Sequence, residues 1–382
     1  MPQLWEGVDA TGGFCSHAEG LELYLQRSKG RPVDVRIVLY EGSLRQYYGD
    51  EAVLSLLAQH ASRWRRLYIC ANSQDAPELI KSYLGPLYAP SLQHLSILLL
   101  GMTILPYSEN SLEFGPTIFI GGAPNLSVVR LQNPGMSSLR PTLRDLTTLH
   151  LEDFHHSRMT FSRFEFMLAH LSHLEHLSIY GDFVTFWPAD GQIHLPKLRS
   201  LRCAHHGQFV QVLECIAAPN LHSLTLKGIR PGEMIGSRGD LLASGSWYPK
   251  LAVLSLNNEN LFSSQSRKLF TFFPSVKRLE LVNTPADDAL QILDDYNLLC
   301  QLQTLMLHRI HDPTRLVPLL LSQSAKLRRP VDTILLHASL AHLSDDLETR
   351  IGCQVETWAC LEPWPAGLGY EDQDDMLLRL SH

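Results

Sequence analysis

The fold is decided by a phrase such as Leu221-His222-Ser223-Leu224-Thr225-Leu226, which is followed 30 residues later by Leu251-Ala252-Val253-Leu254-Ser255-Leu256. The same apolar spacing occurs eleven times along the chain. Its middle apolar residue falls at positions 67, 95, 129, 149, 177, 201, 224, 254, 279, 305 and 334. The mean step is 26.7 residues, from 267 residues over ten intervals. Leucine-rich repeats have a period of about 20–29 residues, so the spacing indicates that class.

Each phrase predicts a short strand, because alternating leucines point to the same side of an extended chain. Helical spacing of apolar residues separates several phrases, at 53–58, 164–171, 210–216 and 289–293. Short parallel strands joined by helices predict an α/β leucine-rich-repeat solenoid of about 11–12 repeats. Its curved parallel sheet is expected on the concave face, with the helices on the convex face.

The chain divides into three expected parts. Residues 1–49 predict an N-terminal cap made of a helix over 21–28 and a strand over 33–37 that closes the sheet. Residues 50–360 form the repeat array, and residues 361–382 an acidic tail with several Pro and Gly residues. The long steps between phrases predict protruding, Gly-rich loops at 101–123 and 228–248.

Composition excludes several classes of protein. With 32 Lys and Arg against 39 Asp and Glu, the net charge of −7 argues against binding to nucleic acid or to an anionic membrane. No apolar run approaches the 18 residues of a membrane span, and the first residues lack a secretory signal. Seven cysteines without a CxxC pair are typical of reduced thiols, so we expect a cytoplasmic or nuclear protein.

Motifs for chemistry are missing from the sequence. It contains no GxGxxG, P-loop, GxSxG, HExxH or CxxC pattern, so we expect no catalytic residues, no cofactor and no metal site. His170-x-x-His173-x-x-His176 does not lie on one helical face, because a strand phrase begins at Leu174. Cys203, beside His205 and His206, takes an inward leucine position. The rival hypothesis is an enzyme whose site follows no known motif.

The residues that alternate with the inward leucines are expected to face the hollow of the solenoid, and we call these 33 positions the concave face. They hold five Arg or Lys, two Glu and five His, so the face is net positive on an acidic chain. The concave-face residues that we expect to bind a partner are Arg66, Tyr68, His94, Arg130, His150, Glu152, His176, Tyr180, Arg202, Lys227, Asn257, Arg278, Glu280, His308 and His337. If the five histidines are solvent-facing, acidification to about pH 5.5 adds up to five charges.

The N-terminal part carries a resemblance to a known family. Pro2-Gln3-Leu4-Trp5, the stretch Leu21–Ser28, Pro32-Val33-Asp34-Val35 and Arg63-Trp64-Arg65-Arg66-Leu67 resemble fungal, mushroom-type F-box proteins with leucine-rich repeats. In that family these sequence motifs follow the F-box, a helical module that binds the Skp adaptor of cullin ubiquitin ligases. No stretch of this sequence resembles an F-box, so we expect the chain alone not to bind the adaptor.

The sequence therefore predicts a non-enzymatic module that binds a protein partner on its concave face. The resemblance implies that it is the substrate-binding part of an F-box-type ubiquitin-ligase receptor. The alternative is a leucine-rich-repeat scaffold without a ubiquitin-ligase link. The identity of the partner does not follow from the sequence.

Overall fold

The computed structural model consists of two compact units, residues 1–197 and residues 198–382. The structure describes residues 7–10, 18–39, 44–72, 75–99, 116–132, 139–152, 159–182, 184–188, 191–204, 209–228, 248–257, 272–284, 301–308, 310, 331–351 and 354–358. The predicted helix at 289–293, the loop at 228–248 except for its end residues, most of the loop at 101–123 and the acidic tail lie outside these residues.

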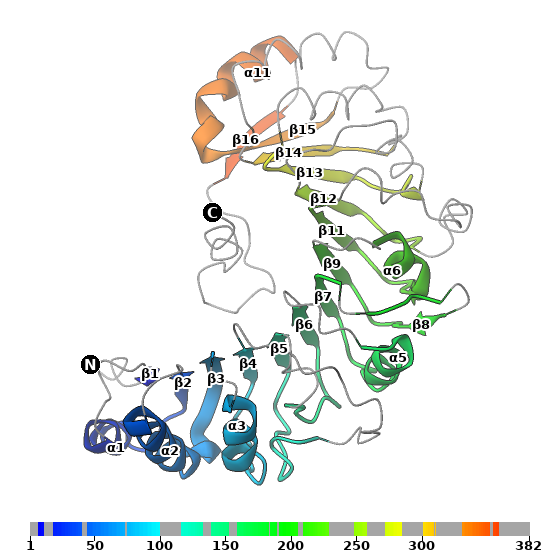
Figure 1. Cartoon of the computed structure of the whole chain (residues 1–382). Coiled ribbons are helices and arrows are strands. Elements are labelled where there is room, and N and C mark those ends of the chain that lie inside the picture. Colours follow the sequence, from blue (N-terminus) through cyan, green and yellow to red (C-terminus); the bar gives the residue numbers. More distant parts are fainter. Residues whose placement is uncertain are drawn as a thin grey trace. The chain divides into compact units, whose positions relative to one another are not determined.

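The first unit is a row of parallel strands with helices on one side. Its strands are β1 (Gly7–Ala10), β2 (Val33–Leu39), β3 (Trp64–Ala71), β4 (His94–Leu99), β5 (Val128–Gln132), β6 (Thr148–Glu152), β7 (His176–Tyr180) and the two-residue β8 (Ile193–His194). Strands β1 to β7 pair in chain order, each parallel to the next. The described helices of this unit are α1 (Ala18–Arg27), α2 (Leu44–Ala58), the 3-10 helix η2 (Ala61–Arg63), α3 (Ala76–Leu84) and α5 (Phe161–Ala169). Helices α1, α2 and α3 lie side by side along one face of the sheet (Figure 1).

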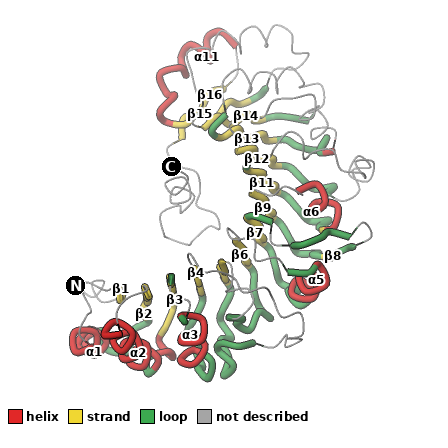
Figure 2. Tube along the Cα trace, viewed as in Figure 1, coloured by secondary structure: helices red, strands yellow, loops and turns green. Residues whose placement is uncertain are grey.

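The second unit repeats this architecture. Its strands are β9 (Ser200–Ala204), β10 (Ile216–Ala217), β11 (Ser223–Lys227), β12 (Val253–Asn257), β13 (Arg278–Val282), β14 (Thr304–His308), β15 (Thr333–His337) and β16 (Gln354–Trp358). Apart from the two-residue β10, they also pair in chain order and in parallel. The described helices of this unit are α6 (Phe209–Cys215), the 3-10 helix η6 (Ala338–Leu343) and α11 (Ser344–Ile351). Figure 2 shows the strands of each unit stacked as a ladder.

The predicted α/β repeat fold is confirmed, and the reason is the register of the leucines. Leu201, Leu224, Leu254 and Leu279 are in register on four successive strands, and each is fully buried. One such strand cannot cover its own apolar side, but a stack of aligned leucines forms a continuous core. The weaker phrases around Leu67 and around 334 also form strands, β3 and β15.

Proline residues in front of the strands form part of the turns that start each repeat. In Ala218-Pro219-Asn220-Leu221 the amide of Leu221 donates to the carbonyl of Ala218 at 3.0 Å. The same turn closes at 89–92, 123–126, 248–251 and 273–276, each with Pro in the second position. Proline fixes the φ angle that the second position of a type I or type II turn requires, so it helps to place the strand that follows.

Two edges of the described sheets differ from the prediction. The strand predicted at 33–37 is β2, but it does not close the sheet, because β1 pairs with its outer side. In the second unit β16 pairs with β15, although its sequence lacks the leucine phrase. There the amide of Val355 donates to the Glu348 side chain of α11 at 3.2 Å.

Candidate functional site

The concave-face residues form rows across neighbouring strands. In the first unit Tyr68, Ser96, Arg130, His150 and Ser178 are in register from β3 to β7. A second row aligns Arg66, His94 and His176 with Val128 and Thr148, and Glu152 is in register with Tyr180. The eight predicted site residues of this unit therefore lie on one face of one sheet.

The expectation that this face is open to solvent is wrong for several residues. His94 is 8% exposed, Glu152 1%, Tyr180 2% and, in the second unit, His308 7%. All 33 side chains are buried or half-buried, and Ser200 and Ser255 are among the buried ones. Neighbouring strands are only about 4.8 Å apart, so long side chains on the same face cover one another. The ring of His150, for example, stacks on that of Tyr180 with centroids 5.0 Å apart.

Glu152 is the centre of a charged network in the first unit. Its Oε1 lies 2.5 Å from Nη2 of Arg130 and 2.5 Å from Nε2 of His150. Burial alone would raise the pKa of the Glu152 carboxyl, but His150 and Arg130 together hold this pKa below its ordinary value of 4.5. Glu152 is therefore a carboxylate near neutral pH, and the network fixes the side chains of β5 and β6 relative to each other.

The pKa of His94 is affected by Arg130 of the same network. Burial, followed by the charges of Arg66 and Arg130, lowers the pKa of His94 to about 4. This imidazole is therefore neutral at pH 5.5. The expectation that all five concave-face histidines gain charge at that pH is wrong for His94, because the burial of this position did not follow from the sequence.

Sequence reasoning missed three charged residues beside the predicted site. Asp34 on β2 accepts two hydrogen bonds from Arg65, at 2.8 and 2.9 Å. The guanidinium of Arg36 lies 5.4 Å from the ring centroid of Tyr68. Asp34 is in register with Arg66, and Arg36 with Tyr68, so β2 extends the concave face by one strand. The alternation Val33-x-Val35-x-Ile37 in the sequence is the signal that identifies this strand.

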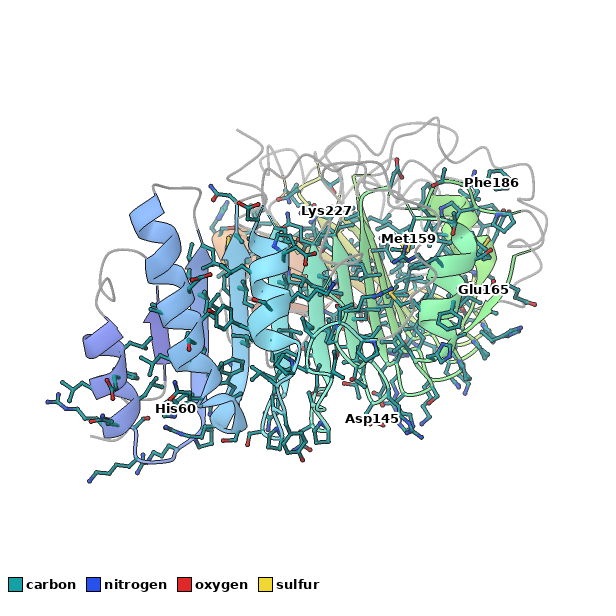
Figure 3. The ribbon with its side chains drawn as sticks, turned by 60° about the horizontal axis from the view of Figure 1, so that its bottom comes forward. His60, Asp145, Met159, Glu165, Phe186 and Lys227 are labelled. Carbon is teal, nitrogen blue, oxygen red and sulfur yellow. The ribbon has the colours of Figure 1, made fainter. Side chains whose placement is uncertain are left out.

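The second unit carries the other seven predicted residues on strands β9 to β15. Nε of Arg278 lies 2.9 Å from Glu280, and its Nη2 lies 3.2 Å from the sulfur of Met306. Asn257 accepts a hydrogen bond from Asn283 at 3.0 Å. Arg202 and Lys227 are half-buried on β9 and β11; Lys227 is labelled in Figure 3.

The two remaining residues of this set form a histidine pair. The rings of His308 and His337 meet edge to face at 4.5 Å. Nδ1 of His337 also accepts the backbone amide of Ser339 at 3.3 Å, which caps η6. One of these histidines therefore has a structural role at the end of its strand.

The described residues contain no group of three or more His, Cys, Asp or Glu arranged to hold a metal ion. His170 ends α5, where its Nδ1 lies 2.6 Å from the carbonyl of Phe166, whereas His176 lies on β7. Cys203 is buried in the core, and burial raises the pKa of its thiol to about 12. A thiol in this environment stays protonated and is a poor nucleophile or metal ligand.

These units define an α/β protein built from repeated short parallel strands. No protein-family model and no curated protein matches the sequence. Among solved structures, the chain is similar to a protein from Bacteroides fragilis, whose crystal structure was determined by the Northeast Structural Genomics Consortium. The two share 12% identity, the match covers 88% of this chain and 78% of that chain, and the TM-score is 0.33. No helix in the described part of the chain combines the length and the apolar character of a membrane span.

Proposed function

We propose that this chain is a non-enzymatic module that recognises a protein partner through its concave face. The observation that supports the proposal is the alignment of charged and aromatic side chains in rows on the face opposite the leucine core. Parallel pairing fixes these side chains in place, so a partner binds a surface that is largely pre-organised. Pre-organisation lowers the entropy cost of association.

The residues on this face suit protein recognition. Arg and Tyr are enriched among the residues that contribute most to binding energy in protein interfaces. Here Arg66 and Tyr68 are half-buried on β3, with Arg36 exposed on β2 beside them. Their side chains are already partly ordered by their neighbours, and each retains surface for contact.

The experiment is affinity capture of a partner with the purified chain, followed by binding measurements on variants of purified components. Tyr68→Ala is expected to weaken binding of the captured partner at least tenfold. Tyr88→Ala is the matched control, because Tyr88 is 57% exposed and lies outside the concave face. Equal loss from both variants, or none from Tyr68→Ala, contradicts a concave-face interface.

The resemblance to fungal F-box proteins supports a more specific form of the proposal, in which the module selects substrates for ubiquitination. The alternative is a scaffold with no ubiquitin-ligase link. Purification of the gene product from its own cells separates them: a ligase receptor co-purifies with the Skp adaptor and a cullin, and a scaffold does not.

A further inference from the structure

Two polar residues lie side by side at the carboxyl ends of neighbouring strands in the second unit. Lys227 ends β11 and Asn257 ends β12, and the two residues are in register. The amide of Gly228 donates to the carbonyl of Asn257 at 3.0 Å, and the φ of Gly228 is 65°. This left-handed glycine turns the chain out of the strand directly after Lys227. Both side chains are half-buried, so each is partly ordered and retains surface for contact.

The side-chain amide of Asn257 has one end occupied. Its Oδ1 accepts a hydrogen bond from Nδ2 of Asn283, which follows β13, at 3.0 Å. Asn283 is itself fixed, because its backbone amide donates to the carbonyl of His308 at 3.0 Å. Since Oδ1 is held toward Asn283, the Nδ2 group of Asn257 faces away from it. Strand β11 with Lys227 lies on that side of β12.

The residues that flank this pair offer no side-chain acceptor. Ala204 on β9 is in register with Lys227, and Val282 on β13 with Asn257. Both flanking side chains are buried and apolar. Lys227 and Asn257 therefore present hydrogen-bond donors between two small apolar neighbours.

The nearest carboxylate of this face is distant and already paired. Over β9 to β13, Glu280 is the one carboxylate among the concave-face positions, and Nε of Arg278 lies 2.9 Å from it. Glu280 lies two strands and two residues from Lys227, which corresponds to roughly 12 Å. This separation exceeds the screening length of about 8 Å at physiological ionic strength. Among the ion pairs of the described residues, none includes Lys227.

A second lysine shows what this side chain does beside an asparagine whose oxygen is accessible. Nζ of Lys250 donates to Oδ1 of Asn220 at 2.7 Å. Beside Lys227 the corresponding oxygen, Oδ1 of Asn257, is bound by Asn283. An acceptor that faces both Lys227 and Asn257 therefore has to come from another molecule.

A carboxylate fits this pair of donors. It carries acceptors only, so one oxygen accepts from Nζ of Lys227 and the other from Nδ2 of Asn257, and the bond to the ammonium is charge-assisted. Strands β11 and β12 lie inside the sheet, with β9 and β13 on either side. A partner chain that crosses the face continues past the pair, so a side chain rather than a chain terminus supplies the carboxylate.

We propose that Lys227 and Asn257 bind the carboxylate of an Asp or Glu side chain of the protein partner. This inference rests on the proposed function and adds the chemistry of one contact in the second unit.

The test uses the whole chain with nitrogen-15 in its Asn side chains and three short peptides. These are acetyl-Gly-Glu-Gly-amide, acetyl-Gly-Gln-Gly-amide and acetyl-Gly-Gly-Gly with a free carboxyl terminus. In NMR spectra at pH 7, the Nδ2 signals of Asn257 are assigned by their loss in Asn257→Asp. The Glu peptide is expected to shift these signals until they saturate, whereas the Gln peptide is not. The Asn220 signals should move with neither peptide.

Lys227→Gln is expected to bind the Glu peptide at least fivefold more weakly, read from the same Asn257 signals, because the charge-assisted bond is lost. The matched control is Lys250→Gln, which changes the net charge equally at an exposed lysine outside the concave face. Its affinity should stay within twofold of wild type, and circular dichroism checks that both variants are folded.

Several results overturn the proposal. They are equal weakening by Lys227→Gln and Lys250→Gln, a saturable shift with the Gln peptide, and no shift with the Glu peptide. Tighter binding of the peptide with the free terminus also overturns it, because that result indicates recognition of a chain end.

The outcome is separable from that of the proposed function. If Tyr68→Ala weakens binding of a captured partner but the Glu peptide leaves the Asn257 signals unmoved, recognition by the concave face stands and the carboxylate site is refuted. If Tyr68→Ala has no effect and the Glu peptide shifts the signals, the site binds a carboxylate and the interface on the first unit is refuted.

Discussion

The Glu152 carboxylate is bound by Arg130 and His150 through the same oxygen, in a position that is 1% exposed. Removal of one member of such a group leaves a charge without its partner in a poorly solvated place. The network therefore contributes to the stability of the first unit as well as to the charge pattern of its surface.

For Glu152→Gln we expect a loss of about 3 kcal/mol of unfolding free energy at pH 7, because Arg130 loses its carboxylate. Since the folded pKa of Glu152 lies below its unfolded value of 4.5, its contribution is fully present above about pH 4.5 and is lost as the pH falls through the folded pKa. In urea melts, the difference in unfolding free energy between wild type and variant should be constant from pH 7 to 5. This difference should become smaller below about pH 4.5.

Glu165→Gln serves as the control for this prediction. Glu165 lies on α5 in the same unit (Figure 3) and should change stability by no more than about 0.5 kcal/mol. If the loss of unfolding free energy caused by Glu152→Gln stays unchanged down to pH 3, the assigned network is contradicted.

His94 also makes the protein less stable as the pH falls, but in a higher pH window than Glu152. Because its folded pKa is about 4 and its unfolded value 6.5, the unfolded chain takes up the proton first, and stability falls as the pH drops from about 6.5 to 4. The difference corresponds to as much as about 3 kcal/mol. We expect His94→Gln to flatten the stability profile in this window.

The same residue offers a direct spectroscopic measurement. The ring signals of His94 in an NMR titration should not move between pH 7.5 and 5.5. Arg66→Gln should raise its pKa, since the charge of Arg66 helps to lower it. A midpoint near 6.5 in the wild type would show that the imidazole is not buried as described.

At the scale of the elements, the aligned inward leucines of the strands form the core of each unit. Leu201, Leu224 and Leu254 are each fully buried, so truncation of any one to Ala is expected to cost about 2–5 kcal/mol through lost apolar burial and the cavity left behind. Ser223→Ala, on the half-exposed face of β11, should cost no more than about 0.5 kcal/mol. If denaturant melts give equal losses of unfolding free energy for the Leu and Ser variants, the buried and half-exposed faces of the strands have been assigned wrongly.

The strands could be predicted from the sequence because their signal is local. The predicted strand positions with middle residues at 129, 149 and 254 all lie within strands of the structure, β5, β6 and β12. Strand β1 was missed because Gly7-Val8-Asp9-Ala10 carries no leucine phrase. Strand β16 was missed for the same reason, since its edge position is stabilised by pairing with β15 rather than by its own pattern.

The burial of the concave face could not be predicted, because it depends on contacts between residues far apart in the sequence. Asp34 meets Arg65 across 31 positions, and His150 stacks on Tyr180 across 30. Periodicity along the chain identifies which face a side chain lies on. It does not show whether the next strand carries a side chain long enough to cover it.

At the scale of the whole molecule, each repeat contacts mainly its neighbours. A mutation in the core of one repeat should therefore destabilise mainly the adjacent strands. We expect Leu254→Ala in β12 to increase hydrogen–deuterium exchange in the paired strands β11 and β13. Peptides that cover β3 and β4 in the first unit should exchange as in the wild type. An equal increase in all strands, measured by mass spectrometry, would instead show one cooperative unit.

The bond between Val355 and Glu348 has a consequence for self-assembly. A strand at the edge of a sheet presents backbone donors to which a strand of another molecule can add, and repetition of that step produces fibrils. Glu348 engages one of these donors on β16, and Glu356 places an exposed charge on the same strand. Glu348→Ala should therefore increase light scattering over time in concentrated solution at pH 7, whereas Glu165→Ala should not. The Glu348 carboxylate of α11 therefore hinders the addition of a strand from another molecule to the edge of this parallel sheet.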